Sequence, residues 1–187
     1  MKRLLILLSI NLAALNLFAQ SNLITEVVIT DALQERNEVP FTDPVLTWND
    51  FKGAPQRNSE WTAMTYSGIK LRYEYKYKND QYSIKIFLYP YMDKSRSWYV
   101  EEGFNDYTLA HEQRHFDITI LVTRQLAEKL QDMELSPKKF SKQINAIHNE
   151  YLEKLKQMQD QYDEETRHGI NKAKQRVWDR KISGELQ

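Results

Sequence analysis

The chain has 187 residues, of which 26 are lysine or arginine, 26 are aspartate or glutamate and none is cysteine. This length suits a single domain with one hydrophobic core. The lack of cysteine excludes disulfide scaffolds, thiolate metal sites and thiol chemistry, so any metal must bind to histidine or carboxylate side chains. A formal net charge of zero gives no general attraction to nucleic acid, and we expect no nucleic-acid partner.

Residues 1–19 have the pattern of a secretory signal peptide. A charged Lys2-Arg3 pair precedes an apolar run that extends to Phe18, and Ala19 is followed by polar residues. The run is short for a bilayer span and contains asparagines, which favours cleavage after Ala19 over retention as a membrane anchor. We therefore predict a secreted or periplasmic protein with no stable membrane span after signal cleavage.

The first half of the remaining chain has the periodicity of strands. Residues 20–44 are interpreted as a lead-in segment and residues 45–187 as one domain. The β-branched run at 26–30 predicts a short strand. Between residues 66 and 88, apolar and polar side chains alternate on both sides of a Lys-Asn-Asp turn, which predicts a hairpin that ends at Pro90. We therefore expect an N-terminal antiparallel sheet.

From Asn105 onward the apolar residues recur at steps of three or four, which is typical of amphipathic helices. Ser136-Pro137 and Gly169 interrupt this spacing. Three helices are predicted, over about residues 105–134, 140–162 and 171–182. The expected fold class is α+β, with the sheet followed by a helical half.

The first predicted helix contains His111-Glu112-Gln113-Arg114-His115, which has the pattern HExxH. A spacing of four places the two imidazoles on one helix face, where they can ligate a single metal ion. Glu112 projects at an adjacent angle, from which its carboxylate can reach metal-bound water, as in a zinc hydrolase. We predict that His111 and His115 bind Zn²⁺ and that Glu112 is the general base. The alternative is a surface helix with two ordinary histidines.

A catalytic zinc site also needs a third protein ligand and an open position for water. The metzincin extension is excluded, because Ile118 and Leu121 stand where that motif has glycine and histidine. His168 is favoured as the third ligand, since the adjacent Gly169 allows the backbone to bring a side chain across to another helix. The alternatives are another histidine and three carboxylates, namely His148, Asp163, Glu134 and Glu150.

The oxyanion that develops during hydrolysis needs a hydrogen-bond donor besides zinc. Tyr162 is the first choice for this catalytic role because it lies close to His168 in the sequence, and Arg114 and Arg167 are further candidates. Tyr162 is also the last member of the apolar stripe of its helix. A purely structural place in the core is therefore the alternative for this residue.

Several of these segments together resemble one bacterial family. They are Leu46-Thr47-Trp48, Asp50-Phe51-Lys52-Gly53, Ser97-Trp98, the run HEQRHFD at 111–117, and Tyr162-Asp163 with Thr166, His168 and Gly169. Over about residues 45–178 the chain resembles the domain of unknown function family numbered 922, described as predicted secreted zinc-dependent proteases. The resemblance implies a zincin-like domain in which His111, His115 and His168 bind zinc and Glu112 is the catalytic base.

The combined expectation is an exported zinc-dependent metallopeptidase that hydrolyses peptide or protein substrates with a zinc-activated water. HExxH specifies the activation of water and not the substrate, so a zinc-dependent amidase acting on another amide, such as one in the cell wall, is an alternative. A non-catalytic zincin-like binding module is the third possibility. In a zincin, an edge strand would pair with an extended peptide beside the HExxH helix. The sequence leaves the oligomeric state and the cleavage specificity open.

Overall fold

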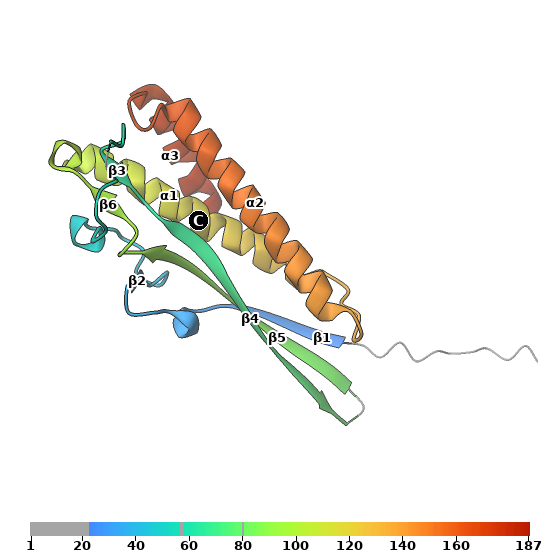
Figure 1. Cartoon of the computed structure of the whole chain (residues 1–187). Coiled ribbons are helices and arrows are strands. Elements are labelled where there is room, and N and C mark those ends of the chain that lie inside the picture. Colours follow the sequence, from blue (N-terminus) through green and yellow to red (C-terminus); the bar gives the residue numbers. More distant parts are fainter. Residues whose placement is uncertain (1–22, 57, 80) are drawn as a thin grey trace, which may run out of the picture.

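The computed structural model describes residues 23–187 except positions 57 and 80, so the signal peptide predicted at 1–19 lies outside the described residues. The described chain forms a mixed four-stranded sheet, a two-stranded sheet and three α-helices (Figure 1). The predicted α+β class is therefore confirmed. Within this described part, no helix is both long and apolar enough to cross a membrane.

The larger sheet is centred on β5 (Gln81–Asp93). β4 (Ser67–Lys78) pairs with it as the predicted hairpin, and the short β2 (Glu38–Val39) also pairs antiparallel. β1 (Leu23–Ile29) runs parallel to β5. The prediction of a purely antiparallel sheet is therefore wrong, because alternating side chains define the two faces of a strand and not the direction of its neighbour.

One further detail of this sheet differs from the expectation. β5 does not end at Pro90. On one edge of β5, the pairing with β1 ends at Leu88 and the pairing with β2 begins at Met92. Pro90 lies in the gap between these two strands, where no partner needs the N–H that proline lacks. The strand predicted at 26–30 corresponds to β1, and the described part of the segment 20–44 contains both β1 and β2, which belong to the same sheet as the hairpin.

A second, two-stranded sheet consists of β3 (Ala63–Met64) and β6 (Trp98–Tyr99), which pair antiparallel. Short 3-10 helices occur at Asp31–Leu33, Trp48–Asp50 and Glu101–Gly103. β3 also contacts the first long helix, which places this small sheet beside the HExxH segment.

The three long helices are α1 (Asp106–Gln131), α2 (Phe140–Thr166) and α3 (Lys172–Leu186), close to the predicted ranges. Asn105 caps α1 by accepting a hydrogen bond from the Thr108 amide at 2.9 Å. In Figure 1, α1 and α2 run side by side along one face of the larger sheet, and α3 packs against both. The bundle therefore covers one sheet face, and α1 is its central member.

Two apolar clusters fix the position of α1. The larger cluster joins strand residues such as Ile86 and Leu88 to α1 residues such as Ile118 and Leu126. The smaller one lies on another side of α1 and consists of Val39, Leu46, Phe51, Met92, Phe116 and Ile120. Because α1 is packed from several directions just after the HExxH segment, its first turns present their side chains in fixed directions.

A capping box at residues 47–50 supports the smaller cluster. The Asp50 carboxylate accepts hydrogen bonds from the Thr47 amide and hydroxyl, both at 2.9 Å, and pairs with Lys94 at 2.8 Å. Burial by itself would raise the pKa of Asp50, but the hydrogen bonds from Lys94 and Thr47 outweigh it and lower this pKa below its ordinary value. The charged carboxylate therefore stabilises the folded state.

We expect Asp50→Asn to lower the free energy of unfolding by about 1 kcal/mol at neutral pH. Because the folded-state pKa is the lower one, this contribution is present above the unfolded pKa of 3.8 and is lost as the pH falls through the folded pKa. Urea unfolding of both proteins at neutral and at acidic pH measures the difference. An equal loss at both pH values would contradict the role assigned to the charge.

Candidate metal centre

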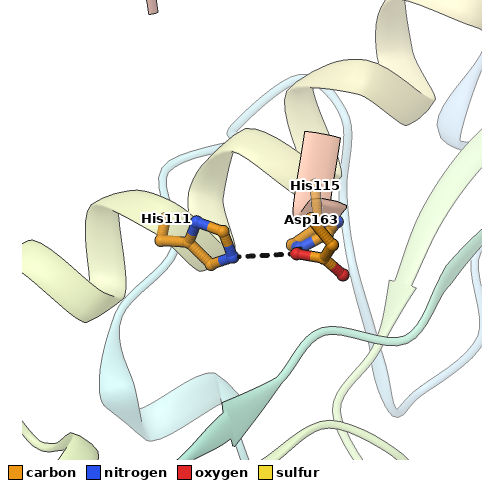
Figure 2. Close-up of side chains that lie close together, drawn as sticks. All are labelled: His111, His115 and Asp163. Carbon is orange, nitrogen blue, oxygen red and sulfur yellow. Dashed lines mark hydrogen bonds and ion pairs between the residues drawn. The ribbon is translucent and has the colours of Figure 1, made fainter. Parts of the chain in front are cut away.

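The HExxH segment lies in the second and third turns of α1, opposite the last turn of α2. Figure 2 shows the side chains of His111, His115 and Asp163 converging from these two helices. Nε2 of each histidine lies 3.1 Å from the same oxygen, Oδ1 of Asp163. The three possible ligand atoms all lie within 4.8 Å of one another. Two imidazoles and a carboxylate are thus gathered around one small volume.

Glu112 stands beside this group and is almost completely buried, with an exposed fraction of 4%. Its Oε2 atom has no hydrogen-bond partner within the described protein, although the residue lines a cavity. A buried carboxylate oxygen without a donor is unfavourable, and a catalytic role or a bound group is one explanation for such an atom in a native protein. Oε2 of Glu112 therefore has an acceptor position open to a group that binds beside it.

The cluster is electrostatically coupled. Burial of Asp163 opposes its ionisation, but hydrogen bonds from His111 and His115 outweigh burial and hold the pKa of Asp163 well below its ordinary value. Burial likewise disfavours a charged His115, but the hydrogen bond and charge of Asp163, together with the charge of Glu112, raise the pKa of His115. Two carboxylates facing two imidazoles in a buried site favour the binding of a cation.

The group opens into a cavity of about 470 Å³. Residues 60–65, which include β3, form one wall of the cavity, and α1 together with the end of α2 forms another. His168, Gly169 and Ile170, which follow α2, complete the rim. The cavity is therefore bounded by every element that carries a predicted site residue, and the HExxH histidines lie in it.

His168, the favoured third ligand, lies on this rim but is not a member of the group of three. Its Nδ1 is 3.5 Å from Oδ1 of Asp163, and its ring stacks on Trp61 with the ring centroids 3.4 Å apart. Asp163, one of the sequence alternatives, is the residue that both HExxH histidines contact. The structure thus brings Asp163 closer to the expected ligand position than His168.

The chain reverses sharply after α2, and this turn positions both residues. Arg167 and His168 adopt left-handed backbone conformations with φ of 51° and 50°, and Gly169 follows with φ of 84°. A Cβ atom at Gly169 would lie 3.4 Å from the His111 ring, which shows how closely the turn approaches α1. The backbone therefore reverses at Gly169, as expected, and the turn packs against the His111 ring.

The remaining third-ligand candidates lie elsewhere. His148 donates a hydrogen bond to the carbonyl of Ile69 on β4, with Nε2 and O 3.0 Å apart. His148 and Glu150 precede Asp163 on α2 by about 20 Å of helix, and Glu134 follows the far end of α1 at a similar distance or more. None of the three can join the cluster in this fold.

Tyr162 is completely buried behind His111 and does not line the cavity. Its ring stacks on the His111 ring with centroids 4.7 Å apart, and its hydroxyl lies 2.8 Å from Oε1 of Gln175 and 3.3 Å from the His111 carbonyl oxygen, both of which are acceptors. Burial raises the pKa of this hydroxyl far above its ordinary value. These contacts correct the expected role as an oxyanion donor, because a hydroxyl buried behind the histidine cannot reach a group in the cavity.

Sequence reasoning missed Gln175 on α3. Its Oε1 lies 2.9 Å from Nδ1 of His111, while its Nε2 lies 2.6 Å from the Tyr162 hydroxyl and 3.0 Å from Oδ1 of Asp179. Gln175 precedes the buried Trp178 by three residues, so helical spacing could have placed it on the inner face of α3. No sequence signal connects a buried glutamine with a histidine on another helix.

The donor set fits zinc. Imidazole nitrogens together with one carboxylate are ligands of catalytic zinc sites, whereas Ca²⁺ and Mg²⁺ prefer oxygen ligands alone. Around a tetrahedral zinc, neighbouring ligand atoms lie roughly 3.3 Å apart, close to the 3.1 Å that separates each Nε2 from Oδ1 of Asp163. Glu112, whose Oε2 is buried without a partner, lines the same cavity.

Comparison with known proteins supplies one match. A family model described as "Bacterial protein of unknown function (DUF922)" matches residues 49–169, which is more than half of the chain. No curated protein and no solved structure is significantly similar to the chain. The matched range contains α1, α2 and the whole cluster of His111, His115 and Asp163, and it ends before α3.

Proposed function

The chain belongs to this bacterial family of unknown function, and we propose that it is an exported, zincin-like zinc metallopeptidase acting on peptides or proteins. In this proposal His111, His115 and Asp163 hold Zn²⁺, and Glu112 is the general base. One observation carries the proposal: both Nε2 atoms converge on one oxygen of Asp163 beside a buried, unpartnered oxygen of Glu112. Three protein ligands and an adjacent base are what a hydrolytic zinc site requires.

The chemistry of the proposal divides between the metal and Glu112. Zinc bound at such a site polarises a carbonyl and makes water a nucleophile near neutral pH. Glu112 accepts the proton of the attacking water as the new C–O bond forms, and then delivers that proton to the leaving amine as the C–N bond breaks. Its burial keeps bulk solvent from competing for the proton, and its free Oε2 leaves an acceptor site open.

The walls of the cavity support a peptide as the substrate. β3 pairs with β6 along one edge, and its residues Ala63 and Met64 line the cavity together with α1. An extended peptide added to β3 would pair main chain to main chain and pass beside the HExxH residues. Such pairing recognises a polypeptide backbone in general and leaves selectivity to side-chain contacts.

Exposed apolar side chains at the mouth of the cavity are suited to such contacts. Trp61 is 42% exposed, Tyr107 is 36% exposed and Ile170 is 80% exposed, and all three line the cavity. They come from the segment before β3, the first turn of α1 and the turn after α2. Apolar groups that gather around one cavity mark a binding surface, so we propose that they hold a large apolar side chain of the substrate.

We expect Trp61→Ala to raise KM about 5–10-fold for a peptide with Phe or Leu beside the cleaved bond, with a much smaller change in kcat. The reason is that the indole supplies apolar contact area without touching the reacting groups. Phe104→Ala is the matched control, because Phe104 is 57% exposed but does not line the cavity. Equal effects of the two substitutions on KM would contradict the role of Trp61.

The function itself is tested by incubating the purified protein with a denatured protein substrate. We expect cleavage that a chelator stops and added zinc restores. Hydrolysis of cell-wall amides without any cleavage of peptides would replace the peptidase by an amidase with the same metal centre. Binding of zinc without any hydrolysis would favour a non-catalytic module.

A further inference from the structure

We infer that Gln175 of α3 fixes the proton of His111 on Nδ1 and thereby holds Nε2 ready to bind the metal. Helix α3 lies outside the range that the family model matches, so this chain would complete its metal centre with a segment beyond that range. The ligand role of His111 rests on the proposed function, whereas the position of its proton is a property of the metal-free protein.

Asp179 determines the orientation of the Gln175 side-chain amide. Nε2 of Gln175 lies 3.0 Å from Oδ1 of Asp179, and the same oxygen accepts a hydrogen bond from Nε of Arg114 at 3.2 Å. A carboxylate that pairs with an arginine can only accept hydrogen bonds, so the nitrogen of the amide has to face Asp179. The amide oxygen of Gln175 must then face His111.

The orientation of the amide determines the tautomer of His111. Oε1 of Gln175 lies 2.9 Å from Nδ1 of His111, and an amide oxygen cannot donate a hydrogen bond. Nδ1 must therefore carry a proton, and Nε2, which faces Oδ1 of Asp163, is the nitrogen that is left to bind a metal. A histidine binds a metal through an unprotonated nitrogen, so a proton fixed on Nδ1 selects Nε2 as the ligand atom.

Burial and contacts with Tyr162 fix the position of the Gln175 side-chain amide. Gln175 is only 3% exposed, and the Tyr162 hydroxyl lies 2.6 Å from its Nε2 and 2.8 Å from its Oε1, so this hydroxyl holds the amide in place while Asp179 sets its orientation. The Tyr162 ring in turn stacks on the His111 imidazole, so one residue contacts both partners. By contrast, Nδ1 of His115 is buried and has no partner at hydrogen-bonding distance and angle within the described residues. Gln159 lies near the His115 ring and favours its charged form. Of the two HExxH histidines, His111 is therefore the one whose Nδ1 is held by a side-chain amide.

The tautomer can be read from the imidazole ¹⁵N chemical shifts of the metal-free wild-type protein at about pH 8.5, where ordinary histidines are neutral. The chain has four histidines, and the His111 signals are assigned by their loss in His111→Asn. We expect a protonated Nδ1 at His111, because Gln175 presents only an acceptor to it. An unprotonated Nδ1 in the wild-type protein would overturn the inference, and this result needs no Gln175 variant to fold.

Gln175→Met tests the consequence for the metal, because methionine keeps the length and volume of the side chain but removes both polar atoms. We expect the His111 proton to move toward Nε2 and the zinc Kd, measured by chelator competition, to rise about 10–100-fold. Arg180→Met, on the exposed face of the same helix, should change neither quantity. Equal zinc affinities of the two variants would overturn the inference.

The two proposals fail in different ways. A wild-type protein that binds no zinc contradicts the proposed function, while its ¹⁵N shifts still decide the tautomer. A wild-type protein that binds zinc and cleaves peptides, but has an unprotonated Nδ1 at His111 when metal-free, keeps the function and contradicts the role of Gln175.

Discussion

Glu112→Gln is expected to lower kcat/KM for a peptide substrate by about 10²–10⁴-fold while the zinc content of the protein stays unchanged. Glutamine has nearly the same shape as glutamate but cannot accept the proton of the attacking water. Glu112 is not among the three residues that gather around the metal position, so its loss should leave metal affinity intact. Steady-state kinetics and metal analysis on the same preparation measure both effects.

Glu128→Gln is the matched control for this substitution, because Glu128 lies on the exposed side of the same helix. It should leave both activity and zinc content unchanged. Full activity of Glu112→Gln would exclude Glu112 as the base and favour a binding module. Loss of zinc in Glu112→Gln would instead indicate that this carboxylate is itself a ligand, which contradicts the assignment of the ligand set.

The second large effect concerns the third ligand. We expect Asp163→Ala to lose zinc as completely as His111→Ala, because Oδ1 of Asp163 is the atom on which both HExxH histidines converge. The loss should exceed the roughly 10–100-fold weakening caused by removing an outer partner of a ligand. His168→Ala should retain about one zinc per chain, since the His168 ring lies at the rim and stacks on Trp61.

Glu164→Ala is the control for Asp163→Ala, because Glu164 is the next residue on α2, is exposed and does not line the cavity. It should bind zinc as tightly as the wild type. Zinc retained in Asp163→Ala and lost in His168→Ala would reinstate the ligand set expected from the sequence, namely His111, His115 and His168.

Local patterns were sufficient to predict most elements of the fold. The helical spacing after Asn105 locates all three helices, and the alternation on both sides of the turn at 78–80 locates the β4–β5 hairpin. The parallel pairing of β1 with β5 could not be predicted in this way, because a strand's own pattern contains no information on the direction of its neighbour. The continuation of β5 through Pro90 likewise depends on where β1 ends and β2 begins.

The same distinction between local patterns and tertiary contacts applies to the residues of the site. His111, Glu112 and His115 lie within one and a half helical turns, so their relation follows from helix geometry alone. The choice between Asp163 and His168 depends on where α2 ends, and two consecutive left-handed residues before Gly169 turn His168 toward the rim. Gln175 reaches His111 only through the packing of α3 on α1. These relations are tertiary, and one sequence does not contain a pattern for them.

The most direct test of the account is to measure zinc content and peptide cleavage on one preparation of the wild-type protein. We predict about one zinc per chain, and cleavage of a denatured protein that stops on removal of the metal and returns when zinc is restored. A correctly folded protein that takes up no zinc at micromolar concentration would contradict the proposed metal centre. Cleavage that continues unchanged after the metal is removed would contradict the proposed mechanism.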